Sequence, residues 1–343
     1  MGQVASTLAR QWDEMLALSA LKPGEKVIVL NKIGGAPAYR EIALEAARFA
    51  GADVAYLEAP STDALPEMAL AALREADLVI DLAFAHDPVV QDLLAGGARF
   101  LVVLEPPEIL ARMFPTPADK ARVRAAAGVL SAGRTFRATT PSGTDFRAAL
   151  GEFRVIGQYG YADEPGHWDQ WPGAFALTYP NERSAEGRVV IAPGDMVFPY
   201  KTYVQTPITL EIEGGFIRSI EGGVDAAYMR DYLAAYDDAD VYAVSHIGWG
   251  LDHRAQWSAL GRYDKAVIEG QDGRAFYGNF LFSTGPNVTG GGARDVPCHL
   301  DIPLRGPSVW VDDVQTVRDG EVLAEDQRVD NESLSGRTMA KSA

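Results

Sequence analysis

The sequence is poor in the residues that build disulfides and thiolate metal sites, with one cysteine, Cys298, and five histidines among 343 residues. One cysteine excludes an intrachain disulfide and a zinc site built from several cysteines, and it fits a reducing compartment better than a secreted protein. No run approaches the roughly 18 consecutive apolar residues of a membrane span. The first sixteen residues carry Arg10, Asp13 and Glu14 where a signal peptide would be apolar. We therefore expect a cytoplasmic protein in which nitrogen and oxygen atoms hold any bound metal.

Positive charge is scarce as well. The chain has 31 Lys and Arg residues against 47 Asp and Glu residues, which gives a formal net charge of −16. A surface this acidic repels the phosphates of nucleic acids and the head groups of anionic lipids. We expect small molecules or other proteins as partners, and neither nucleic acid nor a membrane.

What the first third of the chain does contain is an alternation of short β-rich runs with longer amphipathic runs. Strands are predicted at 26–30, 53–57, 78–82 and 100–104, with helices between them at 40–50, 65–75 and 88–94. This alternation is typical of a parallel sheet flanked by helices. We predict an α/β protein whose N-terminal, Rossmann-like parallel α/β domain spans residues 1–134.

After residue 134 the sequence changes to strands, aromatic residues and Gly or Pro punctuation. A hairpin is predicted at 209–220 around Gly214 and Gly215, a helix at 225–236, and a last hairpin around Asp319 and Gly320. We predict a β-rich α+β metal-binding domain at residues 135–324. Residues 325–343 are polar and are expected to form a mobile tail.

Several familiar catalytic motifs are missing. The first strand is followed by Asn31-Lys-Ile-Gly-Gly35, which has neither the glycine pattern of a dinucleotide site nor the ending of a P-loop. There is no Gly-x-Ser-x-Gly elbow. The apolar surroundings of Cys298 favour an inert, packed thiol over a nucleophile.

A metal site is the chemistry that remains. His299 and Asp301 alternate in one predicted strand, so both side chains project from the same face. A further imidazole, that of His246, lies in the strand-like run 241–250. Two imidazoles and one carboxylate can bind non-haem Fe(II) on one face, or a catalytic zinc. On the pattern alone, His-x-Asp is common, and a hydrogen-bonded structural His is the competing interpretation.

Three further positions are candidates for contact with a substrate. His86 follows the third predicted strand, at the edge where open α/β sheets place their binding crevices, although a polar residue at a helix start is equally ordinary. The segment from Tyr159 to Trp171 is dense in aromatic and acidic side chains and suits the wall of an aromatic pocket, or a structural corner. Arg274 offers donors to a carboxylate or enolate oxygen, or a surface ion pair.

Long stretches of the chain resemble the 2,5-dihydroxypyridine 5,6-dioxygenases of bacterial nicotinate and nicotine breakdown. The resemblance is carried by Glu105-Pro-Pro-Glu-Ile-Leu-Ala-Arg-Met113, Tyr159-Gly-Tyr-Ala-Asp-Glu-Pro-Gly166, Ser245-His-Ile-Gly-Trp-Gly250, Arg274-Ala-Phe-Tyr-Gly-Asn-Phe-Leu-Phe-Ser-Thr-Gly-Pro-Asn287 and Val296-Pro-Cys-His-Leu-Asp-Ile-Pro-Leu304. It implies an aminopeptidase T-like fold and an extradiol-type dioxygenase. Such an enzyme uses Fe(II) and dioxygen to open 2,5-dihydroxypyridine, or a close hydroxypyridine, to N-formylmaleamate. It also implies a homo-oligomer, a hexamer being one candidate.

The resemblance assigns residues as well. Its two His and one Asp iron ligands fall on His246, His299 and Asp301. Its residues for proton transfer and for holding the substrate fall on His86 and Arg274.

At two substrate-binding positions, Gln158 and Gln170, the family resemblance implies an acidic residue and a histidine. Neither glutamine takes up a proton at physiological pH, so the chain departs from the family in the groups available for acid and base steps. Tyr159 and Trp171 would wall the ring.

Two other functional classes compete with the dioxygenase. An aminopeptidase T-like metallopeptidase would need a second metal, for which Glu211, Glu213 and Glu221 could supply carboxylates. Their alternation in the predicted hairpin suggests a solvated face instead. The other class, a catalytically inactive binding protein, would be favoured if no iron were retained on purification.

Overall fold

The computed structural model describes residues 2–34, 39–60, 65–83 and 87–329, without the side chains of residues 2–6, 87 and 88. The chain divides into two compact units. The first comprises Met1–Thr116, Gln158–Gly173 and Asp264–Glu269, and the second comprises Pro117–Gly157, Ala174–Tyr263 and Gly270–Ala343. None of the helices in the described part is both long enough and apolar enough to span a bilayer.

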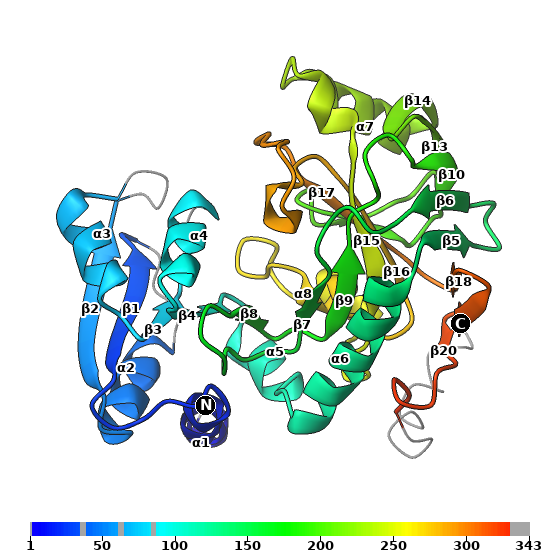
Figure 1. Ribbon diagram of the computed structural model, residues 1–343. Helices are drawn as coiled ribbons and strands as arrows, with labels where there is room; N and C mark the ends of the chain where they lie inside the picture. The colour runs from blue at the N-terminus through cyan, green and yellow to red at the C-terminus, as the bar shows by residue number, and fades with distance from the viewer. Residues whose placement is uncertain (1, 35–38, 61–64, 84–86, 330–343) are drawn as a thin grey trace. The chain divides into compact units, whose positions relative to one another are not determined.

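The first unit is built on a parallel five-stranded sheet in the order β2-β1-β3-β4-β8 (Figure 1). The inner strands β1, β3 and β4 are buried almost throughout, as expected when helices cover both faces of a parallel sheet. The strands are β1 (Lys26–Lys32), β2 (Asp53–Ala59), β3 (Leu78–Asp81), β4 (Arg99–Val103) and β8 (Trp168–Trp171). The four predicted strands are therefore confirmed. The fifth, β8, was not predicted as part of this sheet because it is distant from β4 in the chain and pairs with it only in three dimensions.

Helices cover the two faces of this sheet. The apolar sides of α3 and α4, including Leu73 and Leu93, pack with Ile28, Val79 and Phe100 in one continuous core. On the other side α1 packs against α2 and α5. The helices are α1 (Gly2–Leu18), α2 (Arg40–Phe49), α3 (Glu67–Arg74), α4 (Asp87–Ala95) and α5 (Pro107–Arg112).

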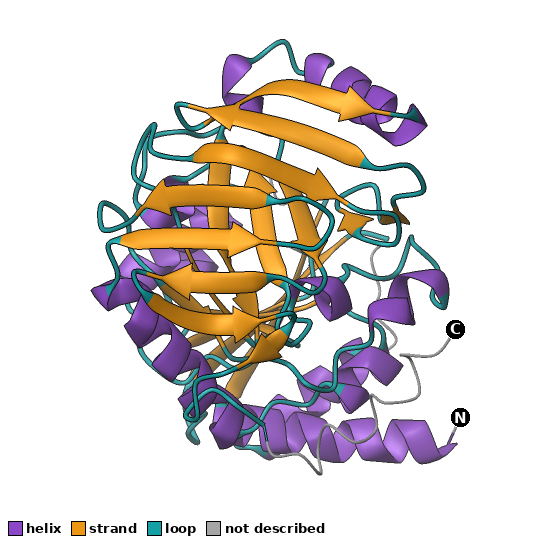
Figure 2. Cartoon of the chain, turned by 90° about the vertical axis from the view of Figure 1, so that its right-hand side faces the viewer, coloured by secondary structure: helices purple, strands orange, loops and turns teal. Residues whose placement is uncertain are grey.

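The second unit holds two antiparallel sheets, one of eight strands in the order β14-β13-β10-β6-β5-β18-β19-β20 and one of five in the order β17-β16-β15-β9-β7. Figure 2 looks onto the larger sheet, with other strands crossing behind it. Phe136 and Phe146 of the larger sheet pack against Phe280 and Phe282 of the smaller one, so the sheets share an aromatic core. The strands of the larger sheet are β5 (Thr135–Thr139), β6 (Asp145–Ala149), β10 (Glu186–Ile191), β13 (Ile208–Glu213), β14 (Phe216–Gly222), β18 (Ser308–Val311), β19 (Val314–Arg318) and β20 (Glu321–Val322).

The smaller sheet carries the residues of the candidate site. Its strands are β7 (Ile156–Gln158), β9 (Phe175–Thr178), β15 (Val244–Gly250), β16 (Phe280–Thr284) and β17 (Leu300–Leu304), and a separate ribbon joins β11 (Met196–Val197) to β12 (Thr202–Tyr203). The helix α6 lies against β9. The helices are α6 (Pro117–Ala132), α7 (Val224–Ala234) and the short α8 (Gln271–Arg274).

Both predicted hairpins form. Gly214 and Gly215 connect β13 to β14 with positive φ angles, and Asp319 and Gly320 connect β19 to β20 with φ of 49° and 82°. Two successive residues with positive φ match the backbone twist of a tight antiparallel connection. The predicted mixture of a parallel α/β domain and a β-rich domain is thus what the structure shows.

The compact units do not follow the predicted domain limits of 1–134 and 135–324. The helix α6 belongs to the second unit, and 158–173 belongs to the first because β8 joins its sheet. The predicted tail at 325–343 also needs correction at its start. Gln327 and Val329 are buried, and Gln327 accepts a hydrogen bond from the indole of Trp249. The packed chain therefore extends at least to Val329.

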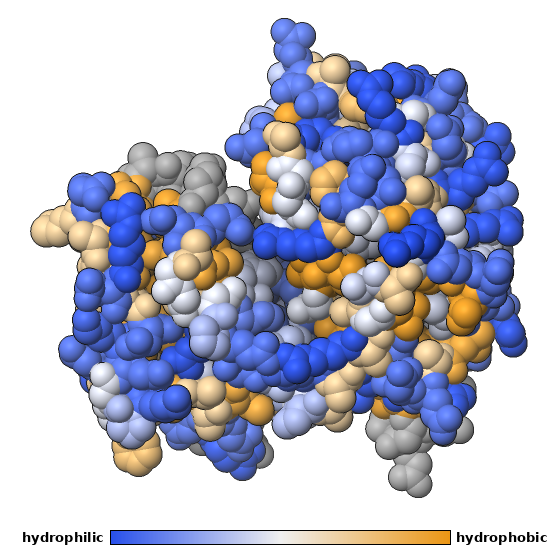
Figure 3. Space-filling view, viewed as in Figure 1, coloured by the Kyte–Doolittle hydropathy of each residue, from blue (hydrophilic) through white to orange (hydrophobic). Residues whose placement is uncertain are grey.

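The surface of either unit seen in Figure 3 is mostly hydrophilic. This agrees with a composition in which 23% of residues are charged and acidic groups predominate.

Candidate metal centre

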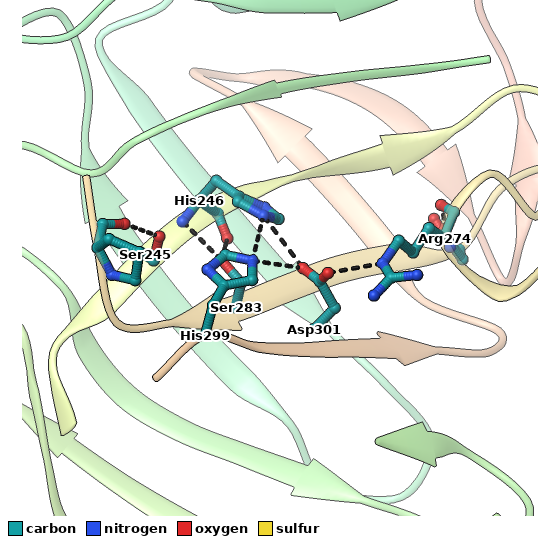
Figure 4. Close-up of polar contacts among 8 residues, drawn as sticks. Ser245, His246, Arg274, Ser283, His299 and Asp301 are labelled. Carbon is teal, nitrogen blue, oxygen red and sulfur yellow. Dashed lines mark hydrogen bonds and ion pairs between the residues drawn. The ribbon is translucent and has the colours of Figure 1, made fainter. Parts of the chain in front are cut away.

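Three predicted ligands converge in the second unit. His246 lies in β15, Asp301 lies in β17, and His299 immediately precedes β17 (Figure 4). The Nε2 atoms of His246 and His299 are 3.2 Å apart, and Asp301 Oδ1 lies 3.1 Å from the first and 3.0 Å from the second. The three donor atoms thus form a nearly equilateral triangle.

The local strand structure explains how these residues meet. β16 lies between β15 and β17, and its Ser283 is directly opposite Asp301. The Ser283 hydroxyl accepts from the backbone N–H of His246 at 2.7 Å and donates to the His246 carbonyl at 2.9 Å. The register of β15 shifts between Val244 and Ile247, at the position of His246. Such an irregularity turns a side chain out of the regular alternation.

The triangle fits one face of a six-coordinate metal. Two ligands at about 2.1 Å from a metal and at right angles to each other are about 3.0 Å apart. The three distances between donor atoms, from 3.0 to 3.2 Å, match that spacing. Across the described residues, this is the one group of three or more His, Cys, Asp and Glu whose ligand atoms lie close enough together to hold a metal ion.

Burial and charge set the protonation states that a metal needs. Burial lowers the pKa of His246, the Asp301 carboxylate raises it, and the net result is a lowered pKa, which favours the neutral imidazole. Burial by itself would raise the pKa of Asp301. The charges of His299 and Arg274 and the hydrogen bonds from both histidines instead hold that pKa well below its usual value. A neutral imidazole and an ionised carboxylate are the forms that bind metal.

Arg274, at the end of α8, contacts the site through Asp301. Its Nε donates to Asp301 Oδ2 at 2.6 Å (Figure 4). The structure therefore brings together Arg274 and Asp301, both of which were predicted site residues. Their ion pair does not lie on the surface, since the Arg274 side chain is only 18% exposed. Cys298 is fully buried, and burial raises the pKa of its thiol to about 11, as expected for an inert side chain.

The other predicted site residues belong to other parts of the chain. His86 falls outside the described residues. Tyr159, Gln170 and Trp171 belong to the first unit. Gln158 is the first residue of that unit's segment 158–173 and also the last residue of β7 in the smaller sheet. Both glutamines are buried, and both approach Gly173, since a Cβ built there would lie 2.8 Å from the Gln170 carbonyl and 3.8 Å from the Gln158 Cβ. The Nε2 of Gln158 is buried without a hydrogen-bond partner among the described residues.

Asp169 organises the aromatic and acidic segment around these glutamines. The buried Asp169 carboxylate accepts from the backbone N–H groups of Tyr159, Gly160 and Gln170, and lies 3.1 Å from His167 Nε2. The ring of Tyr159 stacks on His167, with ring centroids 4.9 Å apart. Much of the hydrogen bonding by the segment's polar side chains therefore stabilises the segment's own backbone.

Trp171 does not behave as a pocket wall. Its side chain is fully buried, its ring packs edge-on against Trp12 and Phe114, and its indole donates to the carbonyl of Leu110 at 3.2 Å. A ring enclosed on all sides by the core leaves no face for a ligand. We assign Trp171 to the core of the first unit because its large apolar surface is better buried than exposed.

The carboxylates suggested for a second metal do not come together. Glu211 in β13 pairs with Arg188 at 2.6 Å and is 43% exposed. Glu213 and Glu221 are exposed on the same hairpin. This confirms the solvated face expected from their alternation.

Comparison with known proteins identifies the family. The NicX model, described as 2,5-dihydroxypyridine 5,6-dioxygenase, matches residues 7–324. The chain belongs to this family. Membership confirms both the resemblance seen in the sequence and the prediction of a dioxygenase enzyme. Together with the donor triangle, it indicates a metal cofactor.

Known relatives of this 2,5-dihydroxypyridine 5,6-dioxygenase family member resemble it in both sequence and structure. It is 44% identical over 339 residues to 2,5-dihydroxypyridine 5,6-dioxygenase of Pseudomonas putida, covering 93% of this chain and 97% of that protein. The structure of 2,5-dihydroxypyridine dioxygenase from P. putida KT2440 matches with a TM-score of 0.90 and 44% identity, covering 94% of this chain and 98% of that one. AmpT from Thermus thermophilus matches with a TM-score of 0.62 and 16% identity, covering 93% and 100%. The last similarity concerns the fold alone and confirms the aminopeptidase T-like prediction.

Sequence reasoning missed two residues that shape the site. Ser283, which holds the backbone of His246, follows the apolar run Phe280-Leu-Phe282, and this change from apolar to polar residues within the strand was the available signal. Phe198, whose backbone pairs with Asp301, gave no signal, because the two residues are 103 positions apart.

Proposed function

We propose that this enzyme is an Fe(II)-dependent dioxygenase that opens the ring of 2,5-dihydroxypyridine, or a close hydroxypyridine, between carbons 5 and 6. Both oxygen atoms of dioxygen enter the product, N-formylmaleamate, so no reducing cosubstrate is needed. The observation that supports this most is the triangle of His246 Nε2, His299 Nε2 and Asp301 Oδ1 in a member of this family. Two imidazoles and one carboxylate on one face are typical of non-haem Fe(II) oxygenases.

An Fe(II) ion held by these three residues would supply open positions for dioxygen and a substrate oxygen, side by side. The protein groups do the rest. Ser283 holds the backbone that carries His246, and Asp301 stays ionised beside Arg274. We propose that donors of the Arg274 guanidinium hold the substrate oxygen and that His86 moves its proton.

We propose that Gln158, Gln170 and Tyr159 form part of the substrate-binding site. A glutamine donates and accepts hydrogen bonds but carries no proton to exchange. If these side chains contact the pyridine ring, they orient it without taking part in acid or base steps. Proton transfer then depends on His86 or on the substrate's own hydroxyl groups.

Anaerobic loading with Fe(II), followed by oxygen-uptake measurements, tests the proposal. The panel should contain 2,5-dihydroxypyridine, other hydroxypyridines, catechols and gentisate. We expect oxygen uptake with a hydroxypyridine and incorporation of both atoms of ¹⁸O₂ into the ring-opened product. Failure of every ring compound to consume oxygen would overturn the proposal.

The metallopeptidase alternative is tested separately with dipeptides and added zinc or cobalt. We expect no hydrolysis, because the carboxylates suggested for a second metal lie exposed on a hairpin. A Gln170→His variant tests the departure from the family. Unchanged rates and an unchanged order of substrates would show that this position lies outside the proton path.

A homo-oligomer, with a hexamer as one candidate, and a cytoplasmic location remain proposals that follow from the family and from the single buried cysteine. Mass photometry of the purified protein would measure the assembly.

A further inference from the structure

Asp301 uses its two carboxylate oxygens differently. Oδ1 faces the Nε2 atoms of His246 and His299, whereas Oδ2 accepts from Arg274 Nε at 2.6 Å. A carboxylate whose second oxygen is engaged in a short, charge-assisted hydrogen bond has one oxygen left for a metal. The direction of this carboxylate thus depends on where Arg274 is held.

Phe198 holds both partners of this pair. Its backbone N–H donates to the Asp301 carbonyl at 2.9 Å, and the Asp301 N–H donates to the Phe198 carbonyl at 3.2 Å. Its ring lies under the Arg274 guanidinium, with the guanidinium carbon 4.5 Å from the ring centroid. This distance is within the range of a cation–π interaction. The side chain is 1% exposed.

The helix α8 is shaped to receive this ring. A Cβ at Gly270, where φ is +92°, would lie 2.1 Å from the Phe198 ring, and a Cβ at Gly273 would lie 3.2 Å from it. Only glycine allows so close an approach at Gly270, whereas a Cβ at Gly273 would make a tight contact with the ring. The ring is therefore clamped between a glycine-containing turn and the guanidinium that it supports.

We infer that Phe198 and Arg274 are positioning residues that hold Asp301 as a one-oxygen metal ligand. The inference rests on the proposed metal site and adds to it a function for Arg274 that needs no substrate. Arg274 has five N–H donors, and the Asp301 contact engages Nε, so this function is compatible with a substrate contact. It also adds Phe198, which acts only through Asp301 and Arg274.

The test measures metal binding without substrate. The proteins are the wild type and the variants Arg274→Gln, Arg274→Lys and Phe198→Leu, titrated anaerobically with Fe(II) and separately with Co(II), whose visible spectrum reports its coordination. We expect affinity to fall about 10- to 100-fold for Arg274→Gln, the usual effect of removing a residue that supports a metal ligand. Arg274→Lys should regain part of the affinity. The Co(II) spectra of Arg274→Gln and Phe198→Leu should differ from that of the wild type.

Arg305→Gln is the matched control. Arg305 follows the same strand, β17, and its guanidinium carbon lies 5.2 Å from the ring centroid of Trp257, so it too forms a cation–π pair. Its backbone N–H donates to Asp195, away from the three ligands. We expect unchanged metal affinity and an unchanged spectrum. Urea unfolding of every variant shows whether lost affinity is only lost stability.

The outcomes separate this inference from the proposed function. In one outcome the wild type binds metal, His299→Ala abolishes this binding, and the Arg274 variants have the same metal affinity and the same spectra as the wild type. That outcome would overturn the positioning inference and leave the dioxygenase proposal intact. A raised KM as the only effect of Arg274→Gln would assign Arg274 to the substrate alone. Affinity that falls equally in Arg305→Gln would mean general destabilisation. No metal binding by the wild type would overturn both.

Discussion

Asp301 is the residue on which most contacts of the site converge. Its carboxylate is buried, lies within 3.1 Å of two imidazole nitrogens and is bonded to a guanidinium. A buried carboxylate stays ionised only where such partners compensate for lost hydration. The negative charge of Asp301 is therefore as important to the site as the shape of its side chain.

Replacing Asp301 by Asn tests that charge. Asn keeps the size and one acceptor oxygen but offers a neutral amide to the metal. We expect Fe(II) affinity to fall by more than the about 100-fold that the loss of a supporting residue costs. Metal content after anaerobic loading and desalting is the measurement. The exposed Asp313→Asn is the control and should keep full metal content. Equal metal content in both variants would show that the charge of Asp301 is not needed to hold the metal.

Asp195 gives a prediction about pH. It is 4% exposed, accepts from the backbone N–H groups of Ala192 and Arg305, and burial raises its pKa to about 6. In the unfolded chain an Asp titrates near pH 3.9. Between about pH 4 and 6 the native state thus binds a proton that the unfolded state does not, and the free energy of unfolding falls as pH rises.

Asp195→Asn should remove this dependence. The free energy of unfolding of the wild type relative to the variant should fall by about 2–3 kcal/mol between pH 4 and pH 7, the equivalent of a shift of about two pKa units. Urea unfolding across this range measures it. Asp313→Asn serves again as the exposed control, with no such change. A constant difference between wild type and Asp195→Asn would contradict the raised pKa.

At the scale of elements, the loop after β16 packs closely against the residues that lead into β17. Gly285 has φ of +104°, and a Cβ there would lie 2.0 Å from the carbonyl oxygen of Cys298. Gly291 in the same connection has a similar φ of +95°, but its Cβ would meet nothing within 4 Å. The two glycines differ in close packing rather than in backbone conformation.

Alanine at these two positions should therefore have different effects. Gly291→Ala should cost the about 1–3 kcal/mol of a strained backbone. Gly285→Ala should cost more, and should also reduce metal content, because the Cys298 carbonyl has to move and His299 is the next residue. Urea unfolding and metal analysis of the loaded proteins measure both effects. Full metal content in Gly285→Ala would show that this close contact does not determine the position of His299.

At the scale of the whole chain, its last described residues complete the core of the second unit. Gln327 accepts from the Trp249 indole at 3.3 Å, and the backbone N–H of Val329 donates to the Tyr277 hydroxyl at 3.1 Å. Trp249 lies in β15, the strand that also carries His246. The end of the described chain therefore contacts β15, which carries one of the candidate metal ligands.

Two truncations test this contribution. A chain that ends at Ala324 should be less stable, because the buried indole N–H of Trp249 loses its partner, at a cost of about 1–3 kcal/mol. A chain that ends at Asp330 keeps both contacts and should unfold at the same urea concentration as the full chain. Equal stability of the shorter chain would mean that water replaces these contacts fully.

Local patterns in the sequence determined much of this protein. Alternation placed His299 and Asp301 on one strand face, hydrophobic periodicity located four strands of the parallel sheet, and paired glycines marked a hairpin. Each of these depends on residues close together in the chain, where geometry is repetitive. The single cysteine and the five histidines also limited the possible metal ligands to those that the structure brings together.

Only the tertiary structure decided the contacts between distant residues. β16 separates β15 from β17 and brings His246 to His299 across 53 positions, and Phe198 meets Asp301 across 103. The tertiary structure also placed β8 in the parallel sheet of the first unit and buried Trp171 in the core of that unit. Such pairings depend on strand register and on the packing of whole sheets, which the alternation within a single strand does not encode. The sequence thus supplied the ligands, and the folded sheet determined that they meet at one point.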